Sequence, residues 1–131
     1  MPTPTSGTFS LTSTVRTIPS FVYEKVKQDI LGKHYSLSLT FVGPDRARAY
    51  NKTHRQKTYV PNVLSFPLDD MTGEIIICPA VAKKEAATFS FSYEGYVAYL
   101  FIHGLLHLKG YDHGATMEKL ERRYVKKYHV A

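Results

Sequence analysis

Residues 92–113, SYEGYVAYLFIHGLLHLKGYDH, contain the longest helix that the sequence predicts. Ser92 is a suitable N-terminal cap, and Gly110 allows the backbone to leave the helix through a left-handed turn. His103 and His107 are four residues apart, so their side chains lie on nearly one face of the helix, about 6 Å apart along its axis. The segment therefore predicts a helix that carries two imidazoles near its C-terminal end.

A third histidine, His113, follows Gly110 closely enough to turn back toward the helical pair. Three neutral histidines leave one position of a tetrahedral zinc ion open, which is typical of catalytic sites and not of structural ones. Water in that position has a pKa of about 7, so hydroxide is available at neutral pH. The single cysteine, Cys78, provides no thiolate set for a structural zinc site. We therefore expect one zinc ion per chain, bound by His103, His107 and His113.

The alternative is that these histidines only pack or face solvent, as single histidines on amphipathic helices usually do. However, three of the six histidines of the chain fall within residues 103–113, with a helix-ending glycine between the second and the third, and this favours metal binding. In His-Glu-x-x-His metalloproteases the Glu beside the first histidine is the general base, whereas here that position is Gly104. Peptide hydrolysis by that mechanism is therefore not expected. Ser65 lacks a nucleophile-elbow context, which argues against a serine hydrolase.

The remaining sequence predicts one α+β domain over residues 1–131, without repeats or linkers. Alternating side chains predict half-buried strands, and the unbroken Ile run in 74–78 predicts a strand that is buried on both faces. Pro19 suits the first turn of a helix, and residues 69–73 are typical of a turn between two strands. The predicted strands are 9–15, 35–42, 63–66 and 74–78, and the predicted helices are 19–31, 45–54, 79–87, 92–109 and 115–128.

The chain is basic, with a net charge of +6, which attracts polyanions such as nucleic acids. One basic segment has no acidic residue from Arg46 to Leu68 to balance it, and it comprises Arg46, Arg48, Lys52, Arg55 and Lys57. A second basic group, within residues 119–127, alternates with Glu118 and Glu121. We interpret this second group as a solvated helix face with internal ion pairs.

No basic start followed by an apolar run is found in residues 1–10, and the opening to about Gly7 is expected to be loose. No apolar stretch is long enough to span a bilayer. We therefore expect a cytoplasmic protein without a membrane partner, and a single cysteine, which allows no intrachain disulfide, fits a reducing compartment. Cys78 itself is expected to be a buried apolar residue. The oligomeric state is not predicted by any feature of the sequence.

The run HGLLHLKGYDH, residues 103–113, resembles the signature of the YbeY family of single-strand-specific, zinc-dependent endoribonucleases. Asn51-x-x-x-Arg55, the segment 62–67 (NVLSFP), the strand 73–78 and the segment 117–121 resemble further parts of that family, in the same order. The resemblance covers residues 35–125. It implies an α+β fold with a mixed four-stranded sheet, surrounding helices and a zincin-like metal-binding helix.

The resemblance also implies a role in ribosomal RNA maturation and ribosome quality control, with single-stranded RNA and the small ribosomal subunit as partners. The catalytic residues are then expected to be Arg55 and His103, the latter also a metal ligand. Three residues depart from the family pattern: Thr58 and Pro61, which flank Arg55 and could alter RNA contacts, and Glu74 in a strand. None of the three is a predicted metal ligand.

Our leading hypothesis is a metal-dependent endoribonuclease in which Arg55 stabilises the charge of a pentacovalent phosphate, with the RNA along the basic segment. Water and the 2′-hydroxyl of the RNA both remain open as the nucleophile. Two other hypotheses are a non-catalytic ribosome-associated RNA-binding factor with a structural zinc, and a metallohydrolase of a small substrate. Asp112 is expected either to orient a histidine or to cap the next turn, and Asn51 to form structural hydrogen bonds.

Overall fold

Four strands form one mixed sheet in residues 7–131, the part of the chain that this computed structural model describes. The sheet order is β1-β2-β4-β3; β1 and β4 run parallel to β2, whereas β3 is antiparallel to β4. The α+β fold and the mixed four-stranded sheet are thereby confirmed. The strands are β1 (Phe9–Ser13), β2 (Ser36–Phe41), β3 (Val63–Asp69) and β4 (Thr72–Ile77).

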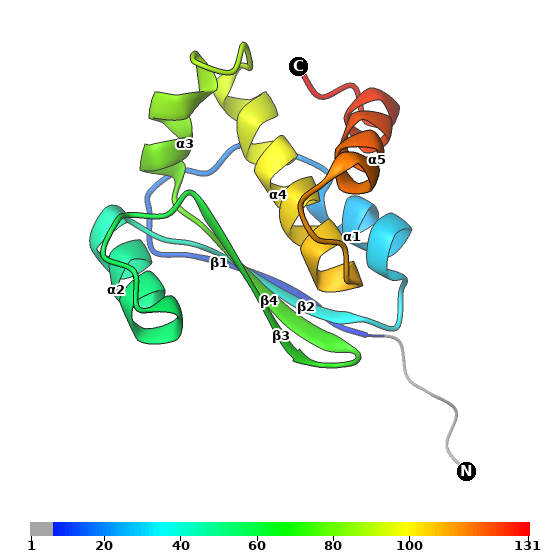
Figure 1. Cartoon of the computed structure of the whole chain (residues 1–131), viewed down its shortest axis with the longest axis horizontal. Helices are drawn as coiled ribbons and strands as arrows, with labels where there is room; N and C mark the ends of the chain where they lie inside the picture. The colour runs from blue at the N-terminus through cyan, green and yellow to red at the C-terminus, as the bar shows by residue number, and fades with distance from the viewer. Residues whose placement is uncertain (1–6) are drawn as a thin grey trace.

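Helices cover both faces of this sheet (Figure 1). The helices α1 and α4 share a large core with one face, while α2 packs on the opposite face in a smaller core. The last helix, α5, lies beside α4 on the side away from the sheet. The helices are α1 (Tyr23–Leu31), α2 (Pro44–Arg55), α3 (Pro79–Ala86), α4 (Tyr93–Lys109) and α5 (Ala115–Lys127).

The strand β4 lies inside the sheet, between β2 and β3, and contributes to both cores. Ile75 and Ile77 belong to the large core, whereas Ile76 and the following Cys78 belong to the small one. Successive side chains of a strand point to opposite faces, so a continuous apolar run fits only a strand that is covered on both sides. The predicted double-sided burial of this segment is confirmed, and so is the burial of Cys78.

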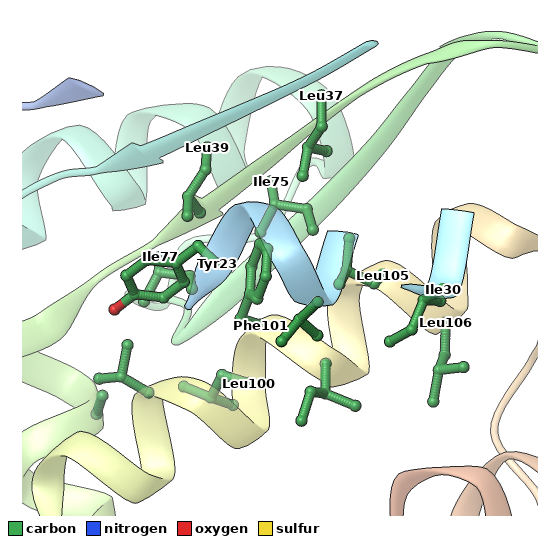
Figure 2. Packing of buried hydrophobic residues seen from close by; sticks show 14 of the residues in the cluster. Tyr23, Ile30, Leu37, Leu39, Ile75, Ile77, Leu100, Phe101, Leu105 and Leu106 are labelled. Atoms are coloured by element: carbon green, nitrogen blue, oxygen red, sulfur yellow. The ribbon is translucent and has the colours of Figure 1, made fainter. Parts of the chain in front are cut away.

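The long helix α4 crosses the sheet and fills the centre of the large core (Figure 2). Phe101 is fully buried and meets the ring of Tyr23 edge-to-face, with 5.2 Å between the ring centroids. At the N-terminus the Ser92 hydroxyl accepts a hydrogen bond of 3.0 Å from the amide of Gly95. At the C-terminus Gly110 has a φ of 112°, a left-handed conformation that favours glycine. Both predicted ends of this helix are confirmed.

Three predicted boundaries were wrong by a few residues, and at two of them a side-chain hydrogen bond takes the place of regular backbone pairing. The first helix begins at Tyr23 and not at Pro19, since the Pro19 carbonyl accepts a bond from the Tyr23 hydroxyl. The first strand ends at Ser13, whose hydroxyl bonds to the backbone of Val15. The turn predicted over 69–73 is shorter, because β3 extends to Asp69 and β4 begins at Thr72.

The predicted loose opening falls largely on residues 1–6, which lie outside the described residues. Among residues 7–131, no helix is long and apolar enough to cross a bilayer.

Replacing Phe101 with Ala is expected to lower the free energy of unfolding by about 3–5 kcal/mol, because it removes a fully buried ring and leaves a cavity between α4 and the sheet. Denaturant unfolding of the wild type and the variant measures this difference. The matched control is Leu68→Ala, since Leu68 is 65% exposed and its truncation should change stability by less than about 0.5 kcal/mol. An equal, small effect of both substitutions would contradict the packing described for α4.

Candidate metal centre

The three histidines that the sequence singles out meet at one place. His103 and His107 extend from the last two turns of α4, and His113 returns from the segment that joins α4 to α5. One ring nitrogen from each residue lies within 4.8 Å of those of the other two, and the ring centroids are 4.6–5.1 Å apart. This cluster could hold a metal ion, with two ligands on a buried helix and one on a surface segment.

His103 is oriented by a carboxylate from α5. Its Nδ1 lies 2.8 Å from Oε2 of Glu121, which is only 6% exposed. Burial raises the pKa of Glu121, but hydrogen bonds from His103 and Tyr99 and the neighbouring histidines outweigh it, so that the pKa falls below its usual value. Glu121 is therefore ionised at neutral pH and accepts the Nδ1 proton of His103. This leaves Nε2 of His103 to face the cluster.

His107 is oriented by the backbone. Its Nδ1 lies 3.0 Å from the carbonyl oxygen of Tyr111, which follows the left-handed turn at Gly110. A carbonyl only accepts, so Nδ1 of His107 carries the proton and its Nε2 carries a lone pair. Burial, and then the charge of His103, lower the pKa of His107 below its usual value. The residue is therefore neutral at pH 7, which is the form that binds metal.

These two hydrogen bonds bring the Nε2 lone pairs of His103 and His107 face to face, 3.1 Å apart. Two opposed lone pairs repel unless a cation or a proton lies between them. Two nitrogens bound to one tetrahedral zinc ion at about 2.0–2.1 Å are about 3.3 Å apart, close to the separation of this pair. Because the ring of His113 joins the same cluster, an ion shared by three rings accounts for the arrangement better than a proton shared by two. The donor set thus fits a metal ion.

The backbone of Gly104 fixes the height of α4 above the sheet. A Cβ atom at this position would lie 2.9 Å from Oγ of Ser65 and 3.1 Å from Cδ1 of Ile75. The Ser65 hydroxyl also donates a hydrogen bond of 3.2 Å to the Gly104 carbonyl, so it serves as a structural donor. Position 104 therefore faces the sheet, where a glutamate side chain has no room. The close packing at this position is thus incompatible with the general-base glutamate that His-Glu-x-x-His proteases carry there.

The histidine cluster opens into a cleft of about 520 Å³. Arg55, the last residue of α2, lies on the wall of the same cleft together with Tyr59. The strand β3 and the segment before it complete this wall. The full lining is Arg55, Tyr59, Pro61, Asn62, Val63, Leu64, Ser65, His103, His107 and His113.

Hydrogen bonds aim the guanidinium of Arg55. Its Nη1 donates to Oδ1 of Asn51 at 3.3 Å and to the hydroxyl of Tyr59 at 3.1 Å. Asn51 is fully buried, and its Nδ2 donates to the Tyr59 carbonyl at 3.0 Å, so the predicted structural role of Asn51 is confirmed. Both bonds of Arg55 use one nitrogen, so within the described chain the others remain available for an anion in the cleft.

Of the five residues in the predicted basic segment, only Arg55 lines this cleft. The others are exposed on or just after α2. Among the departures from the family pattern, Pro61 is buried and lines the cleft, whereas Thr58 is exposed in the preceding loop. Glu74 lies within β4, pairs with Phe66 of β3 and does not line the cleft. Pro61 is thus the one of these three departures that lines the cleft.

Glu121 is the site residue that the sequence interpretation placed wrongly. It was expected on a solvated helix face, but α5 turns it inward, one helical turn after the buried Met117. A lone carboxylate in the apolar stripe formed by Met117, Leu120, Tyr124 and Val125 is the signal that could have identified it. The predicted internal ion pairs of this helix are also not found in residues 7–131; its pairs run to His103 and, from Lys127, to Asp29.

Asp112 plays neither of its two expected roles. Glu121 and the Tyr111 carbonyl orient the histidines, and the N-cap position of α5 is Gly114. Asp112 is exposed, and its negative charge slightly opposes the lowering of the pKa of His107 by burial and by His103.

Replacing Glu121 with Gln is expected to weaken zinc binding about 10- to 100-fold, because the neutral amide no longer holds the Nδ1 proton of His103 as a carboxylate does. Competition with a chromophoric chelator at fixed pH measures the affinity. Glu118→Gln is the matched control, since Glu118 lies on the exposed face of the same helix. Equal affinities of the two variants would contradict the orienting role of Glu121.

The sequence and the fold are similar to those of known proteins. A family model described as Endoribonuclease YbeY matches residues 5–129. Proteins named Endoribonuclease YbeY from Thiobacillus denitrificans and Neisseria meningitidis serogroup C are 35% and 44% identical; the matches cover 72% and 59% of this chain and 71% and 52% of the relatives. The chain thus spans about half the length of the Neisseria relative. A solution structure from Thermotoga maritima has the same fold, with a TM-score of 0.65, 23% identity and coverage of 92% of this chain and 88% of that one. With the family model matched from residue 5 to residue 129, the chain belongs to the YbeY family.

Proposed function

We propose that this chain is a zinc-dependent endoribonuclease that acts on single-stranded RNA, with ribosomal RNA as its substrate. The observation that carries the proposal is the convergence of three imidazoles on a cleft that also contains the guanidinium of Arg55. A single-ion metal site beside the fixed guanidinium of Arg55 suits the cleavage of a phosphodiester, because negative charge grows on the phosphate during the reaction. The name of the relatives, Endoribonuclease YbeY, supports the same substrate class.

The proposed metal ligands are the Nε2 atoms of His103 and His107 and a ring nitrogen of His113, for one zinc ion per chain. Neutral imidazoles are suitable ligands for zinc, and a set of three leaves a position for substrate or water. A bound zinc ion supplies Lewis acidity, by polarising a phosphoryl oxygen and by acidifying water at neutral pH. The remaining chemistry depends on the side chains of the chain itself.

Arg55 is proposed to bind the scissile phosphate and to stabilise the extra charge of the pentacovalent transition state. Its planar guanidinium matches two phosphate oxygens, and Asn51 and Tyr59 hold it in place through Nη1. His103 is proposed as a catalytic residue through its place in the metal set, where Glu121 keeps its proton on Nδ1. Arg55 and the proposed metal ligands would thus act on a phosphate held in the one cleft that all of them line.

The basic exposed residues of α2 provide a path for the RNA backbone toward the cleft, since phosphates are attracted by a positive surface. A flexible single strand fits an open cleft better than a rigid duplex does. A role in ribosomal RNA maturation and ribosome quality control would bring the protein to the small ribosomal subunit. We therefore expect it in the cytoplasm, where that subunit is assembled.

Cleavage breaks one phosphorus–oxygen bond of the RNA backbone, and the leaving oxygen takes up a proton. The nucleophile is either water, which leaves a terminal phosphate, or the neighbouring 2′-hydroxyl, which leaves a 2′,3′-cyclic phosphate and a 5′-hydroxyl. End-group analysis of the products distinguishes the two.

Replacing His107 with Ala is expected to abolish both stoichiometric zinc binding and RNA cleavage, because only two imidazoles remain. Metal analysis of the purified protein and cleavage of a labelled single-stranded RNA provide the two measurements. His54→Gln is the control, since His54 stacks near Tyr50 on α2 and does not line the cleft. If His107→Ala keeps both bound zinc and cleavage, the proposal fails. If metal removal unfolds the wild type and no sample cleaves RNA above a contamination control, a structural zinc is the better description.

Replacing Arg55 with Ala is expected to reduce the rate of RNA cleavage about 10²- to 10³-fold, the usual effect of losing one group that stabilises transition-state charge. Zinc content should not change, because Arg55 is not a proposed ligand. Single-turnover cleavage of the same RNA gives the rate, and Lys52→Ala, an exposed substitution on the same helix, is the control. Equal rates for the Arg55 variant and the control would point to a small substrate that does not need this cation.

A further inference from the structure

A second hollow, which we call the aromatic pocket, adjoins the metal cleft. It has a volume of about 340 Å³, and the rings of Phe89, Phe91, Tyr96 and Tyr99 form its wall. The aromatic pocket and the metal cleft share three residues, namely Asn62, Val63 and the proposed ligand His103. A molecule that occupies the cleft can therefore extend directly into the aromatic pocket.

The rings of this wall are arranged as stacked pairs, except that Phe91 and Tyr96 are tilted by 49° to each other. Phe89 is stacked on Tyr96 with 6° between the ring planes, and Phe91 is stacked on Tyr99 with 28° between them. Tyr96 and Tyr99 are in turn stacked on each other. Flat surfaces of this kind are suited to another flat, apolar ring system and less to a branched aliphatic group.

The turn between α3 and α4 holds Phe89 at the surface. The Phe89 ring is 58% exposed, although a buried position would be expected for an isolated phenylalanine. Its amide donates to the Glu85 carbonyl, and that of Phe91 donates to the Ala86 carbonyl at 2.9 Å. Ser90 between them has a φ of 62°, a conformation that non-glycine residues seldom adopt. The backbone therefore fixes an exposed aromatic ring at the rim of the pocket.

The polar side chains around the pocket are already engaged within the protein. Asn62 donates through Nδ2 to Glu85 at 3.0 Å and accepts through Oδ1 from the amide of Val63. The Tyr96 hydroxyl donates to the same Glu85 oxygen, and burial, with this bond, raises its pKa to about 12, so it stays protonated. What remains for a ligand is mainly the exposed ring of Phe89 and the partly exposed rings of Phe91 and Tyr99.

We propose that the aromatic pocket is a nucleobase subsite, in which one base next to the scissile phosphate stacks against Phe89 and its neighbouring rings. This inference rests on the proposed endoribonuclease function and names the part of the substrate that the function leaves undefined. Stacking on aromatic side chains tolerates every base, because each base has a π-face. The subsite therefore positions the strand without selecting a sequence. The side chains of Asn62 and Tyr96 are already hydrogen-bonded within the protein, so they are not free to read the edge of a base.

A base fits these observations better than an apolar side chain of a protein partner. The pocket continues into the cleft that contains the proposed metal ligands, so its occupant is part of the molecule that reacts there. A single strand also exposes unstacked bases, which a double helix does not. Binding of one unstacked base beside the cleft would thus favour single-stranded over double-stranded RNA.

The test is a substrate scan with a matched set of protein variants. A labelled single-stranded RNA of mixed sequence carries one abasic residue at successive positions around its main cleavage site. For the zinc-loaded wild type, kcat/KM should fall about 5- to 100-fold when the abasic residue occupies one particular position, as expected for the loss of one stacked base. Phe89→Ala should lose a similar factor on the intact RNA and show no further loss with the abasic RNA.

Two other variants serve as controls. Phe89→Leu keeps an apolar side chain but no flat ring, so it should resemble Phe89→Ala, whereas Leu68→Ala, an exposed apolar residue that does not line the pocket, should behave as the wild type. All variants should keep their thermal midpoint and zinc content, since Phe89 is exposed and is not a ligand.

The outcomes separate the two proposals. If the wild type cleaves RNA but Phe89→Ala remains as sensitive to the abasic position as the wild type, the nucleobase subsite is wrong and the endoribonuclease proposal stands. The same holds if Phe89→Leu retains full activity, which would indicate an apolar contact, as with a peptide side chain. If the zinc-loaded wild type cleaves no RNA, the proposed function fails and the subsite fails with it.

Discussion

The contact of the Gly104 backbone with Ser65 and Ile75 determines where α4 lies on the sheet. A helix that packs this closely has little freedom to rotate or slide, because any side chain at position 104 would separate it from β3 and β4. The flanking residues Phe101 and Leu105 lock the helix into the large core. His103 and His107 therefore project from a rigid support toward the edge of β3, where the cleft and the aromatic pocket meet.

A fixed helix alone does not give two usable ligands, since an imidazole can rotate and can carry its proton on either nitrogen. The carboxylate of Glu121 and the carbonyl of Tyr111 remove that freedom, because each accepts a bond from an Nδ1 atom. Both Nε2 atoms then face one point. The helix α5 is thus part of the site, because it packs on α4 and brings the buried carboxylate of Glu121 to the ring of His103.

The sequence predicted those features that depend on local spacing. The pair His103–His107, the cap at Ser92 and the stop at Gly110 all lie within a few turns of one helix, and each is in place. The features it did not predict depend on contacts between distant segments. From the sequence alone Glu121 resembles a surface residue, and only the packing of α5 against α4 buries it. The ring of Phe89 likewise lines a pocket only because its turn lies next to residues of β3 and α4. Likewise, the late start of α1 follows from a bond between Tyr23 and Pro19 that helix signals do not encode.

The three rings differ in how firmly the fold holds them. His103 and His107 stand on a buried helix, while His113 is exposed and lies between Gly110 and Gly114, both of which have positive φ. For an ion bound here, the third ring would detach first and reattach last, without disturbing the helix. The equilibrium affinity would then depend on all three rings, whereas the kinetics of metal loading and loss would depend mainly on this short loop. Exchange of one ion for another could proceed on the folded protein.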